Sequence, residues 1–102
     1  MAKLELTPWD GSEFIAEPEA QADLLADALE SGEARYVAHA LGLIAKARGM
    51  TRIAREAGVS RESLYKSLSL DGNPELATVM AVARALKLEL TARPASGGRE
   101  AA

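Results

Sequence analysis

The chain has 102 residues, of which 48% are apolar, enough for one modest hydrophobic core and therefore for a single domain. It contains no cysteine, which excludes disulfide frameworks and thiol chemistry. Because it has no stretch of membrane-spanning length and no apolar run after Met1 that would form a signal peptide, a cytoplasmic protein is predicted. The net charge of −3 argues against a uniformly basic nucleic-acid-binding protein.

Residues 1–17 are predicted to form an irregular arm with one helical turn starting at Ser12, because turn-forming residues interrupt its scattered apolar side chains. Pro18 suits the first position of a helix, which Ser31 and Gly32 end. The next helix, over residues 33–48, carries apolar residues on two rows, so we expect it to be covered from two sides at the centre of a bundle. One row is Val37, Leu41 and Ile44, and the other is Tyr36, Ala40, Leu43 and Ala47.

Residues 51–68 predict two short helices joined by a tight turn. Thr51 and Ser60 are both of N-cap type, and each precedes a helical pattern. Between them, Gly58 suits the left-handed conformation that ends a helix, and Val59 suits a position beneath the corner. This pattern is typical of a DNA-binding helix-turn-helix, whose second helix enters the major groove.

Further along, Gly72 predicts a turn, and Asn73 and Pro74 predict the N-cap and first position of another helix. Residues 88–93 alternate apolar and polar, which fits a short strand that pairs within the chain or across a dimer. Leu88 and Leu90 are the dimer-contact candidates on this strand. Residues 94–102 are predicted to be a disordered tail. The predicted fold is all-α, a compact bundle of about five short helices containing a helix-turn-helix, within one domain over residues 18–93.

Charge is unevenly distributed along the chain. Residues 1–33 hold nine acidic residues and one basic residue, residues 34–68 hold seven basic and two acidic, and the remainder holds four of each. The positive charge therefore coincides with the helix-turn-helix and the helix before it, where DNA phosphates would lie. Charge clusters are usually solvated helix faces, but the coincidence with the turn motif favours DNA binding here.

Candidate base contacts lie at the start of the second motif helix and one turn later: Ser60, Arg61, Glu62, Tyr65 and Lys66. Arg61 is the strongest of them, because a guanidinium donates two parallel hydrogen bonds to guanine O6 and N7. Glu62 either accepts from a cytosine amino group or pairs with Lys66 on the helix surface. Ser60 fits a cap better than a base contact, and Tyr65 packs either on the DNA or over its own scaffold.

Phosphate contacts are expected from five polar residues around the motif: Lys46, Thr51, Arg52, Arg55 and Asn73. Arg35 and Arg48 are equally well explained as solvated residues. One such helix contacts too few base pairs for useful specificity, so a symmetric dimer is expected, with half-sites roughly 10 bp apart.

The run Ser60-Arg-Glu-Ser-Leu-Tyr-Lys66, followed by Gly72-Asn-Pro74, resembles the antitoxin family described as probable addiction module antidote proteins. Further matches extend the resemblance over residues 40–90 and place it in the Cro/repressor-like (XRE-type, HigA-like) helix-turn-helix class. One departure is Lys87, where the family usually has Gly. The resemblance implies a small cytoplasmic bacterial antitoxin that represses its own operon and binds a RelE/ParE-like toxin encoded beside it.

Toxins of the RelE/ParE type are typically basic, so the acidic first third of the chain is the candidate toxin-binding surface. Trp9, Phe14 and Ile15 are its candidate apolar contacts. The alternative is that these three side chains close the core of the bundle. The core interpretation is favoured for these side chains, and the partner interpretation for the acidic charge.

An enzyme is not expected. His39 is the only histidine, and the chain has neither a Gly-rich phosphate loop nor metal-ligand spacing, so we expect no cofactor and no metal. Two other functions stay open: a stand-alone XRE-type transcriptional regulator without a toxin partner, and a protein-interaction module whose motif does not touch DNA. A small basic open reading frame beside the gene would favour the antitoxin over the stand-alone regulator.

Overall fold

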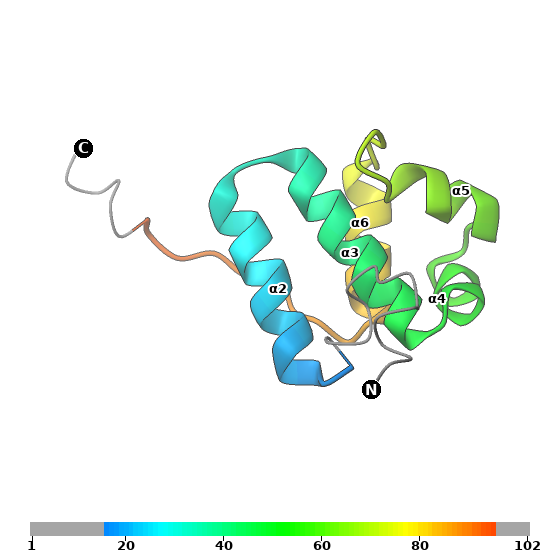
Figure 1. Cartoon of the computed structure of the whole chain (residues 1–102), viewed down its shortest axis with the longest axis horizontal. Coiled ribbons are helices and arrows are strands. Elements are labelled where there is room, and N and C mark those ends of the chain that lie inside the picture. Colours follow the sequence, from blue (N-terminus) through cyan, green and yellow to red (C-terminus); the bar gives the residue numbers. More distant parts are fainter. Residues whose placement is uncertain (1–15, 96–102) are drawn as a thin grey trace, which may run out of the picture.

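The computed structural model describes residues 16–95, which form five helices and no strand (Figure 1). The helices are α2 (Pro18–Ser31), α3 (Ala34–Arg48), α4 (Met50–Ala57), α5 (Arg61–Ser67) and α6 (Leu76–Ala85). Within the same range, no helix has the length and apolar character needed to cross a membrane. The prediction of a compact all-helical bundle is therefore confirmed for this part of the chain, whereas the predicted arm lies almost wholly outside it.

Helices α2 and α3 form an antiparallel pair that packs side by side (Figure 1). Pro18 occupies the first turn of α2, as predicted. At the other end, Gly32 takes the left-handed conformation, with φ 73°, and its N–H donates to the Leu29 carbonyl. Because a residue with a Cβ is strained in this conformation, glycine allows the chain to reverse and begin α3 at Ala34.

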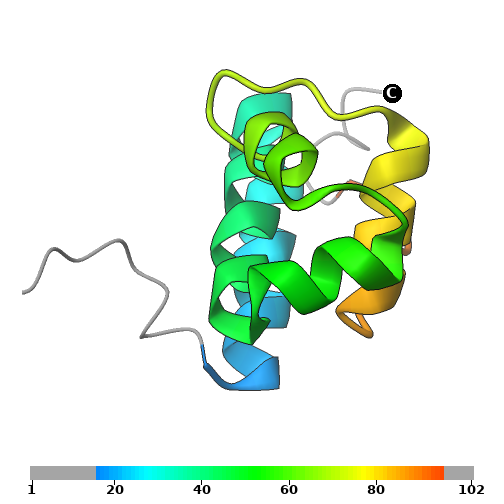
Figure 2. The ribbon, with the colours of Figure 1, turned by 90° about the vertical axis from the view of Figure 1, so that its right-hand side faces the viewer.

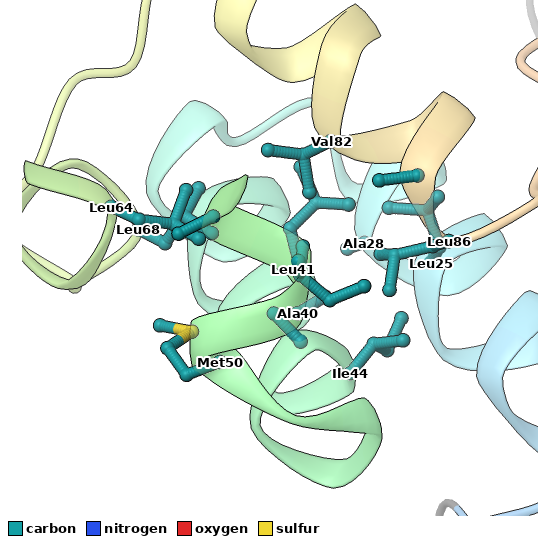
Figure 3. Close-up of a cluster of buried hydrophobic side chains, with 14 residues drawn as sticks. Leu25, Ala28, Ala40, Leu41, Ile44, Met50, Leu64, Leu68, Val82 and Leu86 are labelled. Atoms are coloured by element: carbon teal, nitrogen blue, oxygen red, sulfur yellow. The ribbon is translucent and has the colours of Figure 1, made fainter. Parts of the chain in front are cut away.

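Helix α3 lies at the centre of the hydrophobic core. Leu41 and Ile44 are fully buried, and around them pack side chains from all four other helices (Figure 3). Leu25 reaches this core from α2, Leu64 from α5 and Leu86 from the end of α6. The second apolar row of α3 is only partly covered by the described residues, since Ala40 is buried but Tyr36 is 52% exposed and Ala47 is also exposed.

Helix α6 begins later than the sequence predicted. Its first residue is Leu76 and its N-cap is Glu75, so Asn73 and Pro74 belong to the preceding loop. That loop folds back on the end of α5: the Gly72 N–H donates to the Ser69 carbonyl at 2.9 Å, and Gly72 lies so close to the Ser67 carbonyl that a Cβ would collide with it. The loop between α5 and α6 is therefore longer than the N-cap pattern of Asn73 and Pro74 predicted.

The C-terminal end of α6 reverses at Lys87, whose φ is +61°. The N–H groups of Lys87 and Leu88 donate to the carbonyls of Arg84 (3.0 Å) and Ala83 (2.9 Å), which is the hydrogen-bond pattern of a Schellman motif. The residue in the left-handed position of such a motif is usually glycine. Lys87, noted in the sequence as a departure from the family pattern, thus occupies a position that favours glycine.

The short strand predicted over residues 88–93 does not form in the described part of the chain. Leu88 packs partly buried against the core, and the segment then runs along to α2, where Arg93 Nη2 lies 2.7 Å from Glu30 Oε2. A strand needs a neighbour to accept and donate its backbone hydrogen bonds, and residues 16–95 supply none here. The alternating pattern of residues 88–93 therefore reflects one side chain packed inward on an otherwise exposed segment.

Candidate nucleic-acid interface

The junction between α4 and α5 is a tight corner. Gly58 has φ 80°, and the Val59 N–H donates to the Ala54 carbonyl at 3.0 Å, while the Val59 side chain is partly buried. Ser60 then begins α5 as its N-cap, with its Oγ accepting from the Ser63 N–H at 3.1 Å. The predicted roles of Gly58, Val59 and Ser60 in this corner are confirmed.

Thr51 was predicted as the N-cap of α4, and this was wrong. Helix α4 begins at Met50 and its N-cap is Gly49, whose carbonyl accepts from the Ile53 N–H at 3.0 Å. Met50 is buried in the core, so packing draws the helix start two residues toward the N-terminus. Thr51 consequently lies exposed in the first turn of α4.

The position of α5 depends on a close approach to α3 that sequence analysis missed. A Cβ on Gly42 of α3 would lie 2.8 Å from the Leu68 carbonyl oxygen at the end of α5, closer than side chains tolerate. Leu64 and Leu68 anchor the buried face of α5 in the core (Figure 3). The available signal was a glycine in the middle of an otherwise apolar helix, which indicates close backbone contact.

All five candidate base contacts are exposed: Ser60, Arg61, Glu62, Tyr65 and Lys66. Arg61 Cζ lies 5.4 Å from the centroid of the Tyr65 ring, one helical turn away, which is cation–π geometry. Tyr65 therefore packs beneath Arg61 on its own helix. Glu62 and Lys66 form no ion pair with each other or with other residues in the described range, so the surface pair offered as the alternative for Glu62 is absent.

Four of the phosphate candidates lie on the helices flanking α5, and the fifth, Asn73, is exposed in the loop after it. Arg52 and Arg55 are exposed on α4, where Arg52 Nε lies 3.9 Å from Glu56 Oε2 in a loose surface pair. Lys46, from the last turn of α3, and Tyr65 line the same shallow groove of about 180 Å³ between α3 and α5. The structure thus brings Lys46 close to the candidate base contacts.

Positive and negative charge lie on opposite sides of the described domain. Helices α4 and α5 occupy the right-hand side of Figure 1 and α2 the left, with α3 between them. Helix α2 carries Glu19, Asp23, Asp27 and Glu30 and no basic residue. An approaching polyanion would therefore meet the side of α4 and α5 without facing the acidic helix.

Arg48 has a structural role that the sequence analysis did not predict, since it weighed only a phosphate contact against a solvated side chain. Its Nε donates to Gln21 Oε1 at 2.9 Å and its Nη2 to the Leu86 carbonyl at 2.8 Å. The missed signal was Gln21 itself, a polar residue on the same helical row as buried Leu25. Arg35, by contrast, is exposed.

The remaining candidates fall outside this surface. Leu88 is partly buried against its own core, which leaves Leu90, 40% exposed, as the accessible member of the predicted dimer contact. Trp9, Phe14 and Ile15, the candidate toxin contacts, lie outside the described residues.

Comparison with known proteins gives a family match over most of the chain. A family model described as probable addiction module antidote protein matches residues 5–94. An uncharacterized protein of Haemophilus influenzae is 45% identical over 85 residues, covering 83% of this chain and 88% of the relative. No solved structure matches the chain.

Proposed function

This chain belongs to the family of probable addiction module antidote proteins, and on that premise we propose that it is an antitoxin that binds operator DNA through α4 and α5, represses its own operon and neutralises a RelE/ParE-like toxin. The observation that carries the DNA-binding part is the exposed face of α5 with Arg61 and Lys66, set on a corner held by Gly58 and Ser60. Helix α4 is the first helix of the proposed helix-turn-helix and α5 is its recognition helix.

Within this proposal, Arg61 contacts a guanine and Lys46, Arg52 and Arg55 contact phosphates. The support for these roles is that all four cations are exposed: Arg61 on α5, Arg52 and Arg55 on α4, which packs against α5, and Lys46 on α3, which approaches the end of α5 at Gly42. The carboxylate of Glu56 does not block Arg52, because an exposed pair at 3.9 Å contributes little energy and exchanges readily for a phosphate.

A dimer is part of the proposal. Helix α5 has seven residues and contacts only a few base pairs, so useful specificity requires two copies on two half-sites. With three cations per copy on phosphates, the logarithm of the binding constant should fall with the logarithm of salt concentration with a slope of about −5.

The test is fluorescence anisotropy of the protein with a labelled duplex from its own upstream region, at two salt concentrations, beside a scrambled duplex of the same composition. Tight binding to the upstream duplex, weaker by a factor of at least about 1,000 on the scrambled one, supports operator recognition. Equal affinity for both duplexes contradicts it.

The toxin-binding part rests on the family and on the acidity of α2. Opposite charge would speed the encounter with a basic toxin more than it would raise affinity. Co-expression of this chain with the product of the neighbouring gene should restore growth that the neighbour alone arrests, and the two proteins should co-elute. Operator binding with neither rescue nor co-elution would favour the stand-alone XRE-type regulator.

A further inference from the structure

Helix α6 presents an apolar stripe that the described chain does not cover. Leu76 is 72% exposed and Met80, one turn later, is 50% exposed, and Arg84 continues the same row. The opposite face of α6 is buried through Val82, Ala85 and Leu86. Figure 2 shows α6 along the right-hand edge of the molecule, with its outer side away from the other helices.

The two ends of this stripe carry opposite charges. Glu75 is exposed as the N-cap of α6, and Arg84 is exposed near its C-terminus. Nine positions of helix separate them by roughly 13 Å, too far for a pair within one copy. Neither residue forms an ion pair with another residue in the range 16–95.

We propose that this stripe is the contact with a second copy of the chain, in which the two α6 helices pack antiparallel about a two-fold axis at Met80. In such an isologous contact, each residue of the stripe lies opposite the residue of the other copy that is equally far from Met80 on its other side. Leu76 of the first copy then covers the aliphatic stem of Arg84 of the second copy, and the guanidinium of that Arg84 reaches Glu75 of the first copy.

The charges set the direction of this pairing. In the antiparallel arrangement Glu75 meets Arg84 twice, whereas a parallel arrangement would place Glu75 beside Glu75 and Arg84 beside Arg84. Because exposed ion pairs add little free energy, the affinity comes from burial of Leu76 and Met80 and the charges select the orientation.

This inference rests on the proposed function, which requires a dimer of the chain. It places the dimer contact on α6 in place of residues 88–93, where the sequence predicted it. Leu88 is already packed within its own chain, so residues 88–93 offer only Leu90 as a large exposed apolar side chain. The α6 stripe offers two neighbouring apolar side chains on a formed helix.

Thiol cross-linking tests the geometry without DNA. Since the chain has no cysteine, each single-cysteine variant reports one position. Met80→Cys on the two-fold axis faces its own counterpart and should form a disulfide-linked dimer under mild oxidation. Leu29→Cys, on α2 and 46% exposed in the wild type, is the matched control and should stay monomeric on a non-reducing gel. Efficient cross-linking of Leu90→Cys with none for Met80→Cys would overturn the proposal.

Sedimentation equilibrium tests the energetics. Leu76→Lys should raise the dimer dissociation constant by about a hundredfold, because each copy loses an apolar contact and places a positive charge beside Arg84 of the other copy, whereas Leu29→Lys should leave it unchanged. Arg84→Glu should weaken the dimer, and the second change Glu75→Arg should restore it. Circular dichroism checks that each variant stays helical.

A wild-type protein that sediments as a monomer, or a dimer that Leu76→Lys leaves intact, would overturn the proposal. An intact Met80-centred dimer that shows no operator selectivity would contradict the DNA-binding function and leave the α6 contact standing. A monomer that binds its operator selectively would contradict the α6 contact alone.

Discussion

Arg48 and Gln21 are joined by a hydrogen bond of 2.9 Å from Nε to Oε1, although 27 positions separate them in the chain. The same guanidinium donates from Nη2 to the Leu86 carbonyl. One side chain at the end of α3 therefore connects the start of α2 to the end of α6. Because Gln21 is fully buried, this connection replaces hydration that its amide has lost on folding.

Replacing Arg48 with Met keeps the aliphatic stem and removes both donors. The Leu86 carbonyl and the Gln21 amide oxygen then each lose a charged hydrogen-bond partner, so we expect the free energy of unfolding to fall by about 1–3 kcal/mol. Urea denaturation followed by circular dichroism measures this. Arg35→Met, an equal change at an exposed site, should stay within about 0.5 kcal/mol of wild type. Equal effects of the two changes would contradict the structural role of Arg48.

Lys87→Gly should stabilise the protein by about 1 kcal/mol, because φ +61° is unfavourable for a side chain with a Cβ and free of that penalty for glycine. Lys87→Ala is the matched control: it removes the charge but keeps the Cβ, so it should leave stability nearly unchanged. Thermal unfolding of the three proteins distinguishes the cases. A gain for alanine as large as for glycine would mean that the charge, not the backbone, is responsible.

Gly42→Ala gives two opposite expectations for stability. Helix propensity alone predicts stabilisation by about 1 kcal/mol. The close approach of Gly42 to the Leu68 carbonyl predicts destabilisation by about 1–3 kcal/mol, since the obstructing atom is backbone and cannot rotate away. Urea denaturation measures the sign. A stabilised Gly42→Ala protein would show that α5 does not pack against α3 as closely as described.

Most helix boundaries followed from local chemistry. Pro18 and Gly32 bound α2, and Gly58 with Ser60 defines the corner before α5, because each of these residues acts within a few positions of itself. The start of α6 was predicted at Pro74 and lies at Leu76, since residues 68–75 fold back on the end of α5. That contact joins separate elements, and a cap pattern does not encode it.

The candidate interface was predictable in its residues but not in its contacts. The five polar positions at the start of α5 followed from the helical repeat, and all are exposed. The stacking of Arg61 on Tyr65 and the absence of a Glu62–Lys66 pair depend on rotamers, which a repeat does not specify. The hydrogen bond from Arg48 to Gln21 and the close approach at Gly42 join distant parts of the chain. Only the three-dimensional structure shows such contacts.

Tyr65 should act on operator binding through Arg61. Its ring holds the guanidinium above α5, so Tyr65→Ala should weaken operator affinity about two- to fivefold, the effect of losing an exposed cation–π contact. Tyr65→Phe keeps the ring and should bind close to wild type. In the Arg61→Ala background Tyr65→Ala should have no further effect, as measured by anisotropy. Additive effects would show that Tyr65 contacts the DNA independently.

The most direct measurement of the DNA-binding account compares Arg61→Ala with Arg52→Ala on the upstream duplex and on its scrambled counterpart. Arg61→Ala should lose about 1–3 kcal/mol on the upstream duplex and almost nothing on the scrambled one, because its contact is to a base. Arg52→Ala should weaken both duplexes alike and reduce the salt slope, because its contact is to phosphate. If Arg61→Ala instead weakens both duplexes equally, or neither, α5 is not the recognition helix.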